Sequence, residues 1–174
     1  RQMFIRDSFT APASTKYHLA KQGGLLQHSL NVRDRLEYLC HEETKFNKEF
    51  TMPSFESIAI CGLLHDLCKA NYYKPGTRNV KNEATGQWEK VPSYSVEDLF
   101  PYGHGEKSVF LIERFMKLKV EEAVAIRWHM GAYDDAFRGG SRALNAAMER
   151  TPLVLELHYA DMIATQREKN EEVL

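Results

Sequence analysis

A histidine and an aspartate stand side by side at the end of an apolar stretch, in the segment GLLHDLCKA at residues 62–70. Burying an unpaired carboxylate costs several kcal/mol, so such a group needs a metal ion, a cation or hydrogen-bond donors. The side chains of His65 and Asp66 can ligate one metal ion together, and a carboxylate can also bridge two ions because it has two oxygens. This pair therefore indicates a metal site in the protein interior.

Four more ionisable residues accompany this pair on other predicted helices. His28 lies in LLQHSL, His129 in AIRWHMG and Asp161 in LHYADMIAT, while His104 in YGHGEKS stands at a predicted helix start. A single buried histidine is more often a hydrogen-bonded structural residue than a ligand. An ordered set across separate helices instead predicts one shared metal site. Histidines combined with carboxylates suit Mn, Fe, Ni, Co or Zn better than Ca.

Lys69 follows His65 by four residues and so lies on the same face of a predicted helix. Metal cations would repel its ammonium group unless an anion lay between them, and a phosphate oxygen bound to the metals would be such an anion. We therefore predict catalytic roles for Asp66 and Lys69. A lysine can also face a polyol, so Lys69 alone does not distinguish a phosphorylated substrate from a polyol.

Helical periodicity dominates the chain and predicts the elements that position these residues. The central segment 55–70 has Ser54 as an N-cap and is apolar on nearly every face in its middle, which predicts a buried helix. Two acidic residues favour the start of one helix at residue 121, and Pro152 favours the start of another helix at residue 152. The predicted helices cover residues 25–40, 55–70, 105–118, 121–129, 141–150 and 152–168.

One segment departs from the helical pattern. Residues 71–103 contain three glycines and three prolines, and the stretches TRNVKN and QWEKVPSYSV alternate around EATG. This pattern predicts a β-hairpin at about residues 72–94. We therefore expect an all-α fold with this small hairpin inserted between helices, in a single domain that spans residues 1–174.

The predicted hairpin carries basic side chains interleaved with aromatic ones. Basic and aromatic groups together can hold a phosphate and stack on a base. A solvated flap with a few aromatic residues packed on the helices explains the same composition. Both interpretations stay open, and the residues that we predict to bind substrate are Lys69, Lys74, Arg78 and Lys81.

Composition narrows the class of protein. The 174 residues, 43% apolar and 27% charged, fit one globular domain. The formal net charge of -1 gives no general attraction to polyanions, so any phosphate preference must be local. Three cysteines without CxxC spacing argue against a disulfide framework and a zinc ribbon. No signal-peptide pattern or bilayer-spanning stretch is visible, and we expect a cytoplasmic protein with no membrane partner.

The order of His28, His65-Asp66 and Asp161 resembles the H, HD, D pattern of the HD-domain superfamily of metal-dependent phosphohydrolases. The resemblance runs from about Tyr17 to Thr165. Within it, YHLAKQGGLLQHSLNV, GLLHDLCK, GHGEKS and LHYADMIAT are similar to the catalytic HD domain of bacterial 3'-to-5' exoribonucleases of the YhaM type. The resemblance implies the helical bundle of HD domains.

The resemblance also implies a ligand set and a reaction. It implies that His28, His65, Asp66 and Asp161 bind a first divalent transition-metal ion, and His104 and His129 match the additional pair of dinuclear members. We therefore expect two ions bridged by Asp66, and hydrolysis of a phosphoester by a metal-activated water. Those exoribonucleases also have an OB-fold domain, for which we see no counterpart in these 174 residues, so we expect a small nucleotide, cyclic nucleotide or short oligonucleotide rather than a long nucleic acid.

Two other functions remain open from the sequence. The inositol oxygenases, which share the HD fold, use a similar cage of histidines and aspartates to hold two irons and activate dioxygen. A non-catalytic HD module is the third possibility, although degenerate domains usually lose some ligands and all six candidates are present here.

Overall fold

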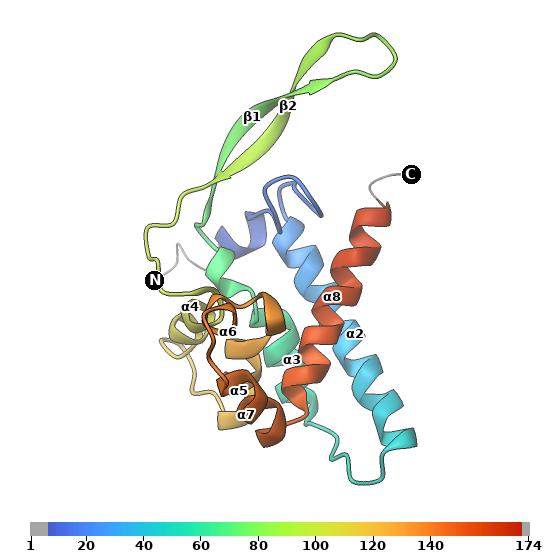
Figure 1. Cartoon of the computed structure of the whole chain (residues 1–174), viewed down its shortest axis with the longest axis vertical. Helices are drawn as coiled ribbons and strands as arrows, with labels where there is room; N and C mark the ends of the chain where they lie inside the picture. Colours follow the sequence, from blue (N-terminus) through green and yellow to red (C-terminus); the bar gives the residue numbers. More distant parts are fainter. Residues whose placement is uncertain (1–6, 172–174) are drawn as a thin grey trace.

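The computed structural model describes residues 7–171, and most of them are helical (Figure 1). Two long helices, α2 (Gly24–Phe46) and α8 (Leu153–Glu171), lie side by side, and shorter helices pack against them. Among the described residues, no helix combines the length and apolarity that crossing a membrane requires. The shorter elements are α3 (Phe55–Leu64), the 3-10 turn η1 (Leu67–Lys69), α4 (His104–Ile112), α5 (Val120–Trp128), the 3-10 turn η2 (Gly131–Tyr133), α6 (Asp135–Arg138) and α7 (Ala143–Arg150).

The predicted all-α class is wrong, because the chain contains a regular two-stranded antiparallel sheet. Strand β1 (Tyr73–Lys81) pairs with strand β2 (Trp88–Val96) along nine residues each. The fold is therefore mainly helical with a small sheet. The hairpin itself, predicted at about residues 72–94, is present, and it projects from the helical body (Figure 1).

The turn between the two strands has a local cause. The side-chain oxygen of Asn82 accepts hydrogen bonds from the backbone N–H groups of Ala84 and Thr85, at 2.9 and 3.1 Å. Gly86 then adopts a φ of 71°, a left-handed conformation that glycine takes without a steric penalty. These residues reverse the chain and let the two strands pair over their full length.

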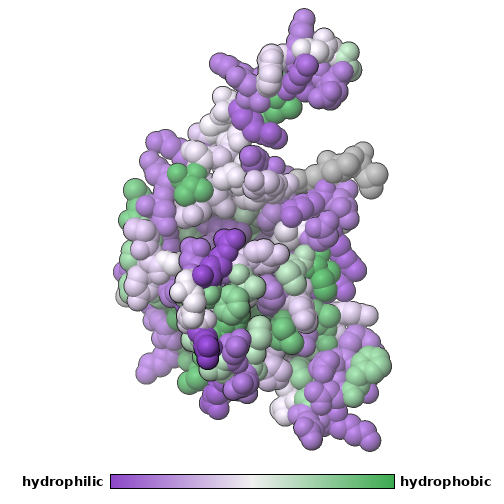
Figure 2. Space-filling view, viewed as in Figure 1, coloured by the Kyte–Doolittle hydropathy of each residue, from purple (hydrophilic) through white to green (hydrophobic). Residues whose placement is uncertain are grey.

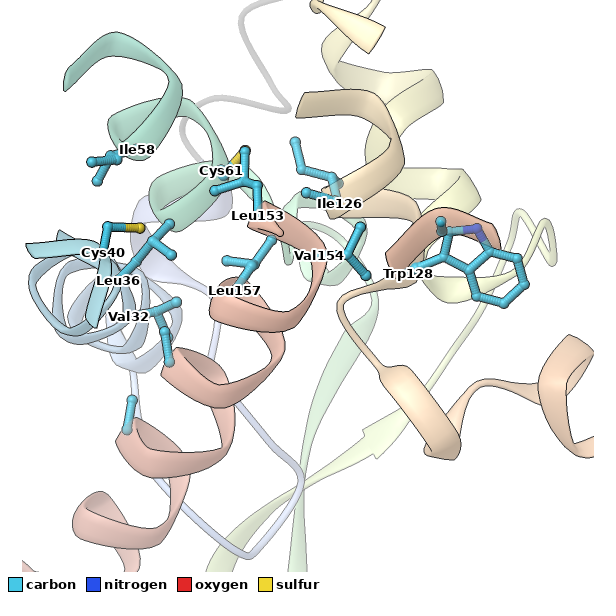
Figure 3. Packing of buried hydrophobic residues seen from close by; sticks show 14 of the residues in the cluster. Val32, Leu36, Cys40, Ile58, Cys61, Ile126, Trp128, Leu153, Val154 and Leu157 are labelled. Atoms are coloured by element: carbon cyan, nitrogen blue, oxygen red, sulfur yellow. The ribbon is translucent and has the colours of Figure 1, made fainter. Parts of the chain in front are cut away.

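A single apolar core lies between α2, α3, α5 and α8 (Figure 3). From α2, the fully buried Val32, Leu36 and Cys40 follow one another at intervals of four residues and so share one face of the helix. Leu157 of α8 is also fully buried in this core. Burying each large aliphatic side chain contributes about 1.5–3 kcal/mol, which fixes the helices relative to one another.

Polar residues continue these apolar rows at one end of the core. His28 lies one turn before Val32 on the same face of α2, and Asp161 lies one turn after Leu157 on α8. The packing that holds the apolar residues together therefore also brings His28 and Asp161 toward each other. The candidate site is an extension of the core rather than a feature of a loop.

Two glycines allow close approach of the helices around this site. A Cβ atom on Gly62 of α3 would lie 2.5 Å from the Cα atom of Arg33 on α2. A Cβ atom on Gly105 of α4 would lie 2.1 Å from the carbonyl oxygen of Arg127 on α5. Both distances are far below van der Waals contact, so each pair of helices can pack this closely only with glycine at the crossing.

Two helices end several residues before the predicted position. The helix predicted over residues 55–70 begins as expected, with the Ser54 hydroxyl accepting the N–H of Ser57, but α3 ends at Leu64 and η1 follows. The chain thus leaves the helix at the His-Asp pair. The helix predicted to reach residue 118 ends at Ile112, and the N–H of Leu118 donates to the Glu113 carboxylate at 2.9 Å instead of a helical carbonyl.

Candidate metal centre

The structure brings the six predicted metal ligands together from five parts of the fold. They come from α2, from the turn after α3, from the start of α4, from the end of α5 and from α8. The histidines of α2, of the turn and of α5 have no exposed surface. In that order the six residues are His28, His65 with Asp66, His104, His129 and Asp161.

Asp66 lies at the centre of this cluster. Its Oδ2 atom is 3.7 Å from Nε2 of His28 and 3.6 Å from Nε2 of His65. Its Oδ1 atom is 2.8 Å from Nε2 of His104 and 3.5 Å from Nε2 of His129. Each oxygen of one carboxylate therefore faces two imidazole nitrogens. A carboxylate placed in this way can contact two separate cations.

Backbone hydrogen bonds determine which ring nitrogen points into the cluster. Nδ1 of His65 lies 3.0 Å from the carbonyl oxygen of Gly62, and Nδ1 of His129 lies 2.7 Å from that of Ile126. A carbonyl oxygen only accepts hydrogen bonds, so each Nδ1 must carry the proton and donate it. In the neutral ring this leaves a lone pair on Nε2, which is the form of histidine that binds a metal.

Three buried nitrogens lack a hydrogen-bond partner among the described residues: Nε2 of His28, of His65 and of His129. Buried polar atoms in proteins nearly always have a partner, and leaving one without it is costly. All three atoms belong to the centre around Asp66, where a metal ion would accept their lone pairs. The cluster therefore fits a metal ion, and its ligand atoms are close enough to share one. Within each of the sets His28–His65–Asp66 and His65–His129–Asp161, the candidate ligand atoms lie within 4.8 Å of one another.

His28 and Asp161 form an ion pair inside the cluster. Nε2 of His28 is 3.2 Å from Oδ1 of Asp161, close enough for strong electrostatic attraction but without hydrogen-bond alignment. Burial lowers the pKa of His28, but the carboxylates of Asp161 and Glu168 outweigh burial and raise the pKa to about 9. Burial raises the pKa of Asp161, and His28 reverses that effect and holds it below the usual range. The carboxylates of Asp161 and Glu168 thus stabilise a positive charge beside them, as a metal ion would supply.

Lys69 contacts the central carboxylate directly. Its Nζ atom lies 2.6 Å from Oδ2 of Asp66, the same oxygen that His28 and His65 face. Burial lowers the pKa of Lys69, but the Asp66 carboxylate outweighs burial and raises it above the usual range. Burial in turn raises the pKa of Asp66, and the charge of Lys69 is the largest effect that lowers it. Both groups are therefore charged in the interior.

The cluster opens into two hollows at the protein surface. One, with a volume of about 480 Å³, is lined by His18, Asp66, Lys69 and Asp161 among others. The other, of about 440 Å³, is lined by residues that include Cys68 and His104. A small molecule can therefore reach the central carboxylate from the first side.

Three of the residues predicted to bind substrate lie on β1, away from the cluster: Lys74, Arg78 and Lys81. All three are exposed, none of them lines either hollow, and Lys74 pairs with Glu97 at 3.4 Å. The hairpin projects away from the helices, and its surface is largely hydrophilic (Figures 1 and 2). Of the predicted substrate-binding residues, the structure brings only Lys69 to the cluster.

Glu168, a nearly fully buried carboxylate on α8, also belongs to the site and was not predicted from the sequence. It accepts hydrogen bonds from Nδ1 of His18 at 2.7 Å, from Nδ1 of His28 at 3.0 Å and from the Asn31 side-chain amide at 2.8 Å. Burial raises the pKa of Glu168, but the bonds from His18 and His28 outweigh burial and lower the pKa to about 2. Glu168 lies seven residues after Asp161, two helical turns along the same face, and this spacing could have identified it.

Replacing Glu168 by glutamine is expected to weaken metal binding about 10- to 100-fold, the usual cost of losing a carboxylate that orients a histidine ligand. The amide keeps the size of the side chain but removes the charge that orients His28 and polarises its ring. Titration of metal-free protein with Zn or Mn against a competing chelator measures the effect.

Glu156→Gln is the matched control, because Glu156 is a buried carboxylate on the same helix outside the cluster. Metal affinity should be unchanged in that variant. Equal affinity of the Glu168→Gln variant and the unaltered protein would show that Glu168 does not support a metal ligand.

Comparison with known proteins adds no relative: no protein-family model, curated protein or solved structure matches the chain. The class of protein is therefore defined by fold and site alone. It is a mainly helical protein with a buried cluster of histidine and carboxylate side chains that could bind a metal ion.

Proposed function

We propose that this protein is a metal-dependent phosphohydrolase of the HD type that cleaves a phosphoester of a nucleotide, a cyclic nucleotide or a short oligonucleotide. One observation carries the proposal. Each oxygen of Asp66 faces two imidazole Nε2 atoms, while the ammonium group of Lys69 stands at one of those oxygens. A carboxylate that can contact two cations, beside the ammonium group of a lysine, suits two metal ions and an anionic substrate.

Two groups of residues would hold two divalent ions of Mn, Fe, Ni, Co or Zn. His28, His65 and Asp161 would bind one ion, His104 and His129 would bind the other, and Asp66 would contact both. Bound there, the ions would polarise a phosphoryl oxygen and make a water molecule acidic enough to serve as the nucleophile near neutral pH.

The protein's own side chains would bind and orient the substrate. Lys69 and His18 both line the hollow of about 480 Å³ that leads to Asp66. Lys69 is a charged amine, largely shielded from solvent, that can neutralise negative charge on a phosphoryl group. Glu168 fixes the ring of His18 through the 2.7 Å contact to Nδ1. A hollow of this volume is typical of sites for small ligands, which favours a nucleotide-sized substrate over a long nucleic acid.

A panel of phosphoesters tests the proposal. Metal-free protein is loaded with Mn, Ni, Co or Mg and assayed on bis(p-nitrophenyl) phosphate, p-nitrophenyl phosphate, cyclic nucleotides and a short oligonucleotide. We expect hydrolysis of at least one phosphoester, loss of activity with a chelator, and recovery when the metal is restored.

The Asp66→Asn variant, purified in parallel, controls for contaminating phosphatases. Absence of turnover on every substrate, with metal content established, would contradict the proposed reaction. Oxygen uptake by the iron-loaded protein together with that result would favour the oxygenase alternative.

A further inference from the structure

A buried thiol lies beside the Asp66 oxygen that faces His104. The Sγ atom of Cys68 is 3.4 Å from Nδ1 and 3.5 Å from Nε2 of His104. That same Nε2 atom is 2.8 Å from Oδ1 of Asp66. Candidate ligand atoms of these three residues all lie within 4.8 Å of one another. The thiol therefore belongs to the same cluster as Asp66 and His104, both of which the sequence predicted as metal ligands.

The surroundings of Cys68 differ from those of the other two cysteines. Cys40 and Cys61 belong to the apolar core, whereas Cys68 lies on η1 and lines the hollow of about 440 Å³ together with His104. The backbone N–H of Cys68 donates to the hydroxyl of the fully buried Ser108 at 3.1 Å. This bond ties η1 to α4, the helix that begins at His104.

The spacing of sulfur and nitrogen suits a shared ion. Zinc lies about 2.3 Å from a thiolate sulfur and about 2.0 Å from an imidazole nitrogen, which places two such ligands about 3.5 Å apart in a tetrahedral site. The Sγ atom of Cys68 lies 3.4 and 3.5 Å from the two ring nitrogens of His104, which matches that value. A thiolate is also a soft ligand, which favours Zn, Fe or Co over Mn or Mg.

We propose that Cys68 is a thiolate ligand of the ion held by Asp66 and His104. One half of the centre is then a mixed site of carboxylate, imidazole and thiolate that selects Zn, Fe or Co. On binding, the S–H bond is replaced by a bond from sulfur to the metal, and the proton leaves to solvent. This proposal rests on the metal centre of the proposed function but does not depend on the reaction that the centre performs.

Cobalt(II) provides a direct spectroscopic test, because a thiolate bound to Co(II) gives a near-ultraviolet charge-transfer band and imidazole or carboxylate ligands do not. The metal-free protein is titrated with Co(II), and bound cobalt is counted by mass spectrometry. We expect the band in the unaltered protein and its loss in the Cys68→Ser variant. In that variant Zn affinity should fall at least about tenfold, and more than Mn affinity does.

The double variant Cys40→Ala, Cys61→Ala serves as the matched control. The chain has three cysteines, so this variant retains only Cys68. A band in the double variant assigns the sulfur to Cys68 even if Cys68→Ser does not fold.

Cobalt binding to the unaltered protein without the band, or a band that persists in Cys68→Ser, would overturn the proposal. If the protein bound no cobalt at all, both the proposed thiolate ligand and the proposed metal centre would be overturned. A charge-transfer band without hydrolysis of any phosphoester would support the thiolate ligand and contradict only the proposed reaction.

Discussion

Replacing Asp66 by asparagine is expected to remove bound metal and to lower phosphoester hydrolysis by about 1,000-fold or more. Both oxygens of this carboxylate face ring nitrogens, and four histidines surround it within 3.7 Å. The amide has nearly the same shape but only one oxygen and no charge, so it cannot contact two cations. Metal ions contribute several kcal/mol to stabilising the transition state, and each 1.36 kcal/mol is a factor of ten in rate.

Metal content by mass spectrometry and turnover on the best substrate of the panel measure this effect. Glu122→Gln is the matched control, because Glu122 is also a buried carboxylate that pairs with a lysine, Lys119, at 3.6 Å, but it lines neither hollow of the cluster. That variant should keep its metal and its activity. Full metal occupancy together with retained hydrolysis in the Asp66→Asn variant would rule out a bridging role for this carboxylate.

Removing the metal is expected to lower the unfolding temperature by about 10 °C. An ion present at a thousand times its dissociation constant stabilises the folded state by about 4 kcal/mol. For a chain of this size, each kcal/mol corresponds to roughly 2–4 °C. The physical source is the cluster itself, where three buried nitrogens have no hydrogen-bond partner within residues 7–171 and the carboxylates of Asp66 and Asp161 face them. In the unfolded chain water solvates all of these groups, so the ion binds the folded state selectively.

Thermal unfolding followed by circular dichroism, with and without a chelator, measures this difference. The Asp66→Asn variant should show almost no difference between the two conditions, because it cannot hold the ions. Identical unfolding temperatures for metal-loaded and chelated unaltered protein would indicate that the cluster is a structural polar network rather than a metal site.

Local patterns in the sequence predicted most of the elements. The apolar rows of α2 and α8 follow the helical period, and the Ser54 cap marks the start of α3. The same patterns indicated a hairpin near residues 72–94 but led to the wrong fold class, because the pairing of two nine-residue strands makes a regular sheet. Such patterns can be recognised in a sequence because each depends only on residues within a few positions of one another.

The identities of the candidate ligands also came from the sequence. His28, the His65-Asp66 pair and Asp161 are conspicuous because a core normally excludes such groups. Their surroundings predicted that they would be buried, and the structure places them together as an extension of the apolar rows. That the cluster binds metal, that it binds two ions, and that the protein hydrolyses a phosphoester stay predictions that the experiments above decide.

Only the tertiary structure decided how these groups are arranged. The contacts of Asp66 with the imidazoles of other elements, the bond from His28 to Glu168 and the place of Cys68 beside His104 all join residues from different elements. Such distances follow from how the helices pack, including the close crossings at Gly62 and Gly105. A sequence encodes each helix through local periodicity, whereas the positions of ligand atoms depend on the summed packing of the whole core, which no local pattern contains.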